Sequence, residues 1–190
     1  MWKKWLYSST LLALPRSKRV AYIGVVTAFT VIANAMFELK FFGVQFSLTI
    51  FITALAGVVL GAAPGFLAGF MGDLIGFMLH PFGEYSPWIG ISTGLMAVIA
   101  ALIIRLPMNI KGGVYLKFLY VSVWIFFVCT AGINTIYLHR VWYQSMSYKE
   151  CLVTRLFVEG QFWNTLANSV LLIAVTPMLA KVKPLKLKIR

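Results

Sequence analysis

The chain has 190 residues, of which 61% are hydrophobic and only 12% are charged, against roughly 45–50% and 25% in soluble domains. With a mean hydropathy of +0.87, this composition excludes an ordinary soluble domain and indicates an integral membrane protein. The formal net charge of +12 would also suit a nucleic-acid binder, but the basic residues flank apolar stretches and form no basic face of a soluble fold. A β-barrel is disfavoured, because its strands would alternate apolar and polar residues.

The first 15 residues are predicted to lie at the membrane interface, since Trp2, Trp5 and Tyr7 stand beside lysines, as in the headgroup layer. No small-x-small site for signal cleavage follows. Cys129 and Cys151 form neither a disulfide framework nor a metal-ligand pattern.

Residues 20–180 are predicted to form a bundle of six transmembrane helices within a single membrane domain spanning 1–190, followed by a basic cytoplasmic tail at 181–190. The apolar stretches place the six helices at about 20–37, 46–60, 65–79, 87–104, 114–138 and 162–180. We expect a short polar connection over 38–45, a tight reversal at Gly61 to Gly65 with Pro64 in the first turn of the next helix, and a long polar connection over 139–161 with room for further helix.

Small residues follow one face of the first helix, at Ala21, Gly24 and Ala28. Such a stripe allows another helix backbone to approach closely. Two interpretations remain open, packing inside the bundle and docking of a partner. Glycines repeat from Gly65 to Gly76 in the third helix, which predicts tight packing against a neighbour.

An even number of crossings places both termini on one side. That side carries most of the lysines and arginines and no acidic residue, whereas the opposite loops mix both signs. The positive-inside rule therefore predicts cytoplasmic termini and external polar-aromatic loops.

Catalytic classes are excluded by missing residues. A phosphate-binding loop needs Gly-Lys, a dipeptide that the chain lacks, and two histidines cannot supply a His-Glu-x-x-His metal site in this sequence. Gly90-Ile-Ser92-Thr-Gly94 has the spacing of a nucleophile elbow, but no plausible general base accompanies Ser92, so we take the match as coincidence. We expect a binding protein and no enzyme, with no metal and no cofactor bound by this chain.

The external loops carry the candidate ligand-binding residues, because aromatic walls with a few polar groups suit an amphipathic organic ligand. The substrate-binding candidates are Asn34, Phe41, Tyr85, Trp88, Asn134, Tyr137, Arg155, Gln161 and Asn164. For any single aromatic the alternative is an interfacial belt of Trp and Tyr.

Two charged residues have open roles. Asp73 stands inside an apolar helix, where a carboxylate usually faces the bundle interior or a polar cavity, and its role is left open. Arg155 is expected to hold an anionic group of the ligand. The alternative is an ion pair with Glu159, four residues on.

Three local patterns carry a resemblance to a known family. They are FSLTIFITALAGVVLG at 46–61, Asp73-Leu-Ile-Gly76 followed by Glu84-Tyr-Ser-Pro-Trp88, and Asn134-Thr-Ile-Tyr-Leu138 followed by Arg155. The chain resembles the S components of energy-coupling factor (ECF) vitamin transporters, particularly the folate-type group.

The resemblance implies a six-helix protein in a prokaryotic plasma membrane that binds a water-soluble vitamin at the external face. It also implies docking on a transmembrane coupling subunit, powered by two ATPase subunits that use ATP, with Ala21, Gly24 and Ala28 facing that subunit. Folate is favoured as the vitamin, with pantothenate, pyridoxine or hydroxymethylpyrimidine, and cobalamin as alternatives. A rival function is an accessory membrane subunit or facilitator without ATPase partners.

Overall fold

The computed structural model describes residues 6–36, 38–41, 44–81, 84–107 and 113–180. The architecture is helical, as predicted, with one small hairpin added. The elements are α2 (Ser9–Ala13), α3 (Arg16–Met36), β1 (Glu38–Phe41), β2 (Val44–Ser47), α4 (Thr49–Leu60), α5 (Ala62–Leu79), α6 (Pro87–Ile103), α7 (Gly113–Trp124), η1 (Ile125–Asn134), α8 (Thr135–Val141), α9 (Tyr148–Val153), η2 (Thr154–Val158) and α10 (Gln161–Ala180), where η marks π-helix.

Within the part of the chain that the structure describes, three helices are long and apolar enough to cross a membrane. They are α3, α5 and the continuous helix Gly113–Val141, which joins α7, η1 and α8, while α4 and α6 are shorter apolar helices. The number of crossings remains a prediction.

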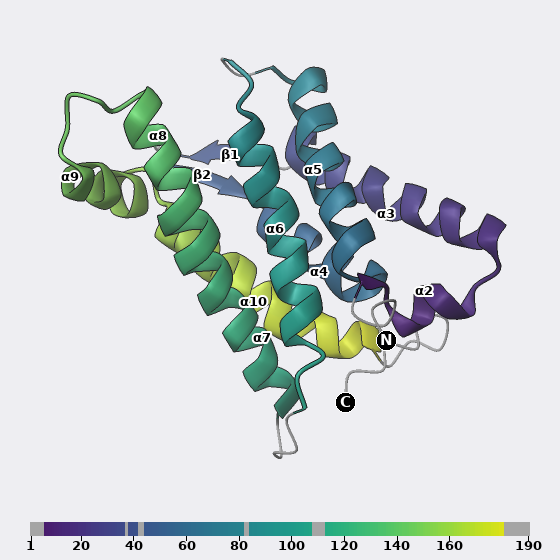
Figure 1. Cartoon of the computed structure of the whole chain (residues 1–190). Coiled ribbons are helices and arrows are strands. Elements are labelled where there is room, and N and C mark those ends of the chain that lie inside the picture. Colours follow the sequence, from purple (N-terminus) through teal and green to yellow (C-terminus); the bar gives the residue numbers. More distant parts are fainter. Residues whose placement is uncertain (1–5, 37, 42–43, 82–83, 108–112, 181–190) are drawn as a thin grey trace.

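The helices place the connections at two ends of the molecule (Figure 1). The β-hairpin, the α5–α6 connection and α9 lie at the upper end in this view, which we call the hairpin end. Helix α2 and the beginning of α7 lie toward the opposite end. Loops far apart in the sequence therefore gather at the hairpin end, as a shared site requires.

The expected helical start at residue 46 is wrong, because Phe46 belongs to a β-strand. Strands β1 and β2 pair antiparallel, with Glu38 opposite Ser47 and Phe41 opposite Val44. Strand pairing provides hydrogen-bond partners for backbone N–H and C=O groups that would lack them in an irregular connection. The alternating sequence of β2, Val-Gln-Phe-Ser after Gly43, was the available signal.

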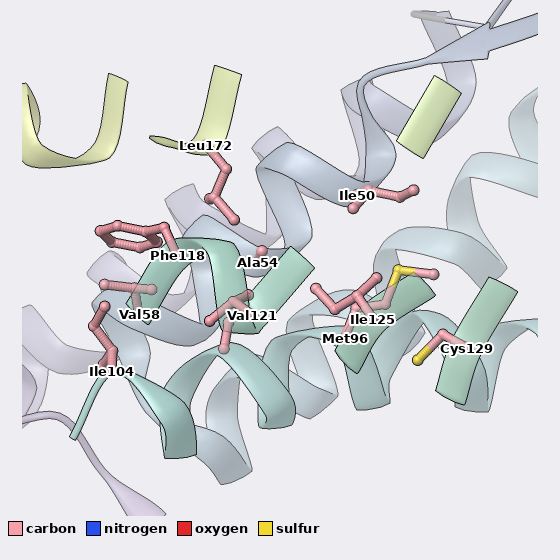
Figure 2. Packing of buried hydrophobic residues seen from close by; sticks show 11 residues of the cluster. Ile50, Ala54, Val58, Met96, Ile104, Phe118, Val121, Ile125, Cys129 and Leu172 are labelled. Carbon is pink, nitrogen blue, oxygen red and sulfur yellow. The ribbon is translucent and has the colours of Figure 1, made fainter. Parts of the chain in front are cut away.

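The main apolar core joins α4, α6, the α7–η1 helix and α10. Figure 2 shows Val58, Phe118 and Leu172 of this cluster converging from three helices. Phe118 is completely buried. At Gly57, an added Cβ would overlap the backbone carbonyl of Ala97, so α4 and α6 cross with their backbones in direct contact.

The predicted close packing of the third helix is confirmed in α5. A Cβ at Gly76 would lie 2.6 Å from the Asn34 Cβ, and one at Gly72 would overlap Thr30. The Thr30 hydroxyl also donates to the Ala68 carbonyl at 2.8 Å. Helix α3 is therefore held against α5 beside the chain reversal at the hairpin end.

The N-terminal segment closes the turn between α4 and α5. The Ser8 Oγ donates to the Val59 carbonyl at 2.6 Å and the Ser8 amide donates to the Leu60 carbonyl at 2.9 Å. Gly61 has φ +104°, and a Cβ there would lie 2.6 Å from the Ser8 nitrogen, so only glycine fits this reversal. The tight turn predicted at this position is confirmed, while the interfacial location of residues 1–15 stays a prediction.

Candidate ligand-binding site

Two adjoining polar cavities lie among the helices that meet at the hairpin end. One, of about 160 Å³, opens between α3, α5 and the connection that follows α5. The other, of about 170 Å³, reaches from α3 and α6 to η1 and α10. Both are lined by Asn34, Asp73 and Ile89, so we treat them together as the polar chamber.

Asp73 lies where the two cavities meet. Its Oδ1 accepts a hydrogen bond from the Thr93 hydroxyl at 3.3 Å, which joins α5 to α6 and orients the carboxylate. The phenol of Tyr85 faces the same carboxylate. Burial first, and then the negative charge of Asp73, raise the pKa of Tyr85 to about 12. The phenol therefore remains a neutral donor at physiological pH.

On the α3 side, the Asn34 amide is already engaged by the protein. Its Nδ2 donates to the Thr30 carbonyl at 2.9 Å, and its Oδ1 accepts from the Thr49 hydroxyl at 3.3 Å. Asn34 thus links α3 to the beginning of α4 and lines the chamber in a fixed orientation.

On the α10 side, Asn168 holds the chamber wall together. Its Nδ2 donates to the Ser47 carbonyl at 2.7 Å and to the Asn164 Oδ1 at 2.9 Å, and its Oδ1 accepts from the Phe51 amide at 3.0 Å. Asn164 Oδ1 accepts from the Ser47 amide as well, at 3.0 Å. The amide plane of Asn164 is therefore set, with its oxygen occupied by protein donors.

The π-helix η1 forms a third wall. Its wider turn brings residues four or five apart onto one face, and Thr130 and Asn134 both line the chamber. The Thr135 hydroxyl donates to the Thr130 carbonyl at 2.9 Å, which supports the widened turn. π-helical turns occur frequently at functional sites.

Several buried polar atoms around the chamber have no hydrogen-bond partner among the described residues. They include the hydroxyls of Tyr85 and Ser86 and the Oδ1 of Asn134, and all three residues line the chamber. An unpaired buried polar group costs about 1–3 kcal/mol, so these atoms indicate where a polar ligand would bind.

The structure brings five of the predicted binding residues to the chamber. Asn34, Tyr85, Asn134, Gln161 and Asn164 line it. Among the described side chains, those of Trp88, Tyr137 and Arg155 do not line the two cavities.

Trp88 has 57% of its surface exposed, in keeping with the interfacial belt, and Tyr137 is partly buried in α8. The backbone of Phe41 ends β1, but its side chain lies outside the described residues.

Arg155 is buried behind the chamber wall in a network of its own. Its Nη1 donates to the Thr135 hydroxyl at 2.8 Å, and its Nε lies 3.6 Å from Glu159 Oε2. The Tyr143 hydroxyl also donates to Glu159. The ion pair that the sequence offered as an alternative is therefore present, and Arg155 reaches η1 through Thr135.

Several chamber or wall residues were absent from the predicted set, among them Asp73, Ser86, Thr93, Thr130 and Asn168. Asp73 stood out in the sequence without an assigned role. Asn168 follows Asn164 by one helical turn in an otherwise apolar helix, which was the available signal. The threonines carried none, because a lone threonine in a membrane helix often bonds to its own backbone. Among the described residues no group of three or more His, Cys, Asp or Glu side chains lies together as a metal site would require.

The predicted docking residues lie on the outside of α3. Ala21, Gly24 and Ala28 are exposed, and a Cβ at Gly24 would have no atom within 4 Å. The described helices therefore do not use this stripe for their own close packing.

Comparison with known proteins agrees with this fold. A family model described as "ECF-type riboflavin transporter, S component" matches residues 16–184. The solved structure titled "Crystal structure of FolT bound with folic acid" superposes with a TM-score of 0.68, at 17% identity, covering 86% of this chain and 96% of that one. No curated protein matches this chain significantly.

Proposed function

Because the chain belongs to the family of ECF-type riboflavin transporter S components, we propose that it is the folate-binding subunit of a vitamin importer. As a member of that family it is a membrane-bound, vitamin-binding transport component and no enzyme. The observation that carries the proposal is the polar chamber, whose buried Tyr85, Ser86 and Asn134 oxygens have no partner among the described residues.

Two arguments favour folate among the vitamins. The local patterns resemble the folate-type group, and a protein of the same fold is titled as bound with folic acid. Riboflavin is the second candidate, because the matching family model carries its name. The chain itself binds no other cofactor in this proposal, and ATP is used by partner subunits.

Direct titration separates the two vitamins. Purified protein should bind folate stoichiometrically, and mass spectrometry of ligand extracted after expression should find folate. Binding of riboflavin with no binding of folate would overturn the choice of vitamin and leave the family unchanged.

The proposed topology has six membrane crossings and cytoplasmic termini in a prokaryotic plasma membrane. The start of α3, the end of α6 and the beginning of α7 lie toward the end opposite the hairpin end (Figure 1). Arg16, Arg105 and Lys117 belong to these segments or follow them closely in the sequence, and the positive-inside rule favours that end as cytoplasmic. A cysteine at position 149 should react with an impermeant reagent on intact cells, and one at position 111 should not. The reverse pattern would invert the topology.

The exposed stripe of Ala21, Gly24 and Ala28 is the proposed docking face for the coupling subunit, which two ATPases drive. Small exposed residues let a partner helix approach closely. Gly24→Trp should abolish uptake and retain folate binding, while Phe29→Trp, at an already bulky exposed position of the same helix, should retain both. Loss of binding together with uptake in Gly24→Trp would contradict a docking role.

The rival function, an accessory subunit or facilitator, predicts different partners. An importer subunit should co-purify with ATPases, and its uptake activity should require them. Uptake by this chain alone in ATPase-deficient cells would favour the facilitator.

A further inference from the structure

The carboxylate of Asp73 lies at the centre of the polar chamber, where both cavities meet. Glu84, the other acidic residue of the lining, borders only one cavity. A carboxylate is an acceptor with two oxygens, and it binds most strongly to a pair of adjacent donors. We propose that Asp73 selects the ligand by binding a ring edge with two neighbouring N–H donors, a statement that rests on the proposed folate ligand.

The pterin ring of folate offers such an edge. Its N3–H and 2-amino group form an amidine-like pair of parallel donors, which matches the two carboxylate oxygens. The corresponding edge of a flavin has one N–H between two carbonyl oxygens. A carboxylate placed there would face at least one carbonyl oxygen and lose a bond, so this position discriminates between the two ring systems.

Asn34 and Asn164 do not replace Asp73 in this role. Asn34 has both its amide nitrogen and its amide oxygen engaged by Thr30 and Thr49. The Asn164 oxygen already accepts from Ser47 and Asn168. Both amides are therefore committed to the protein as acceptors. Asp73 has four lone-pair sites; its Oδ1 accepts from the Thr93 hydroxyl, and the Tyr85 phenol faces the same carboxylate.

Thr93 supplies the orientation that selection needs. Its hydroxyl contacts Asp73 Oδ1 at 3.3 Å and the Ile89 carbonyl at 3.0 Å, so the carboxylate is tied to α6 across the chamber. The unpartnered Tyr85 hydroxyl lies on the same side of the chamber. It offers a further polar contact to a ring bound at Asp73.

A pair of ligands tests the proposal without changing the protein. The 2-oxo analogue of folate carries a carbonyl where folate has its 2-amino group, so it lacks the second donor. Wild-type protein should bind folate about 10–100-fold more tightly than this analogue, the range expected when a charge-assisted bond is lost. Equal affinities would overturn the role of Asp73 while leaving the proposed vitamin intact.

Asp73→Asn tests the residue itself. The amide has one acceptor and one donor, which matches the 2-oxo analogue better than folate, so the ratio of the two affinities should fall at least tenfold or reverse. Glu150→Gln removes the same charge at an exposed position of α9 that lines neither cavity, and it should leave the ratio as in wild type. An unchanged ratio in Asp73→Asn would overturn the proposal.

Failure of folate binding is distinguishable from failure of this inference. If wild-type protein binds riboflavin and not folate, the proposed vitamin is wrong, and the proposed contact between Asp73 and the amidine-like edge of the pterin is wrong with it. If Asp73→Asn does not fold, as judged by its thermal unfolding, the wild-type comparison of folate with its 2-oxo analogue still decides the question.

Discussion

Replacing Asn168 by alanine should weaken both the fold and the site. The Asn168 side chain is completely buried and joins α10 to the junction of β2 and α4. Helix α4 begins without a side-chain cap from its own N-cap residue, Leu48. The Phe51 amide lies in its first turn, where backbone N–H groups have no acceptor within the helix. Asn168 accepts from that amide and donates to the Ser47 carbonyl.

The expected loss follows from those two contacts. Interhelical hydrogen bonds in membrane proteins average about 0.6 kcal/mol each, but leaving a buried polar group unpaired costs about 1–3 kcal/mol. With two backbone groups left open, we expect the free energy of unfolding to fall by about 2–3 kcal/mol and the Tm by roughly 4–12 °C. Folate binding should weaken too, because Asn164 loses its contact with Asn168.

Thermal unfolding of the purified protein in detergent, with and without folate, measures both effects. Ser169→Ala is the matched control, since the Ser169 hydroxyl donates within α10, to the Thr165 carbonyl. Ser169→Ala should stay within about 0.5 kcal/mol of wild type. If Asn168→Ala were no less stable than Ser169→Ala, the interhelical role of Asn168 would be refuted.

Other perturbations address packing, the Arg155 network and pH. Gly57→Val should prevent stable folding, since even a Cβ would overlap the Ala97 carbonyl, and a protein with wild-type Tm would contradict that crossing. Arg155→Ala should weaken folate binding by one to two orders of magnitude if Arg155 holds the ligand, the range for a charge-assisted contact. Affinity within about threefold of wild type, combined with a lowered Tm, would assign it to its pair with Glu159. The hydrogen bond to Glu159 first, and then burial, raise the pKa of Tyr143 to about 12. The native state therefore holds this proton more tightly than the unfolded state, so stability should fall as the pH rises between about 10 and 12, and Tyr143→Phe should remove this part of the pH dependence of the Tm.

Local features of the fold were predictable because they depend on neighbouring residues. Pro87 was expected to open a helix and occupies the first position of α6. The glycine spacing up to Gly76 predicted a close helix contact, and Gly61 predicted a tight reversal. In each case the conformational freedom or constraint of one residue decides the local backbone.

The chamber wall was less predictable, because its contacts join distant parts of the chain. Asn168 is bonded to Ser47, 121 residues away, and no local pattern indicates such a pair. The π-helical turn around Asn134 was also not predicted, because it differs from an α-helix by one residue per turn and leaves the apolar pattern nearly unchanged. Sequence reasoning thus identified Asn134 and Asn164 as polar residues in apolar helices and could not orient them.

The glycine face of α5 has a consequence for how this protein tolerates mutation. At Gly69, Gly72 and Gly76 the neighbouring chain lies within about 3 Å of where a side chain would begin, whereas Leu67 and Met78 of the same helix are exposed. A saturation library over α5 should therefore give a periodic fitness profile, with glycine required at the inward positions and almost any apolar residue accepted between them. The positions that tolerate no substitution would then identify the face of α5 that packs against its neighbours, and the tolerant positions would identify its exposed face.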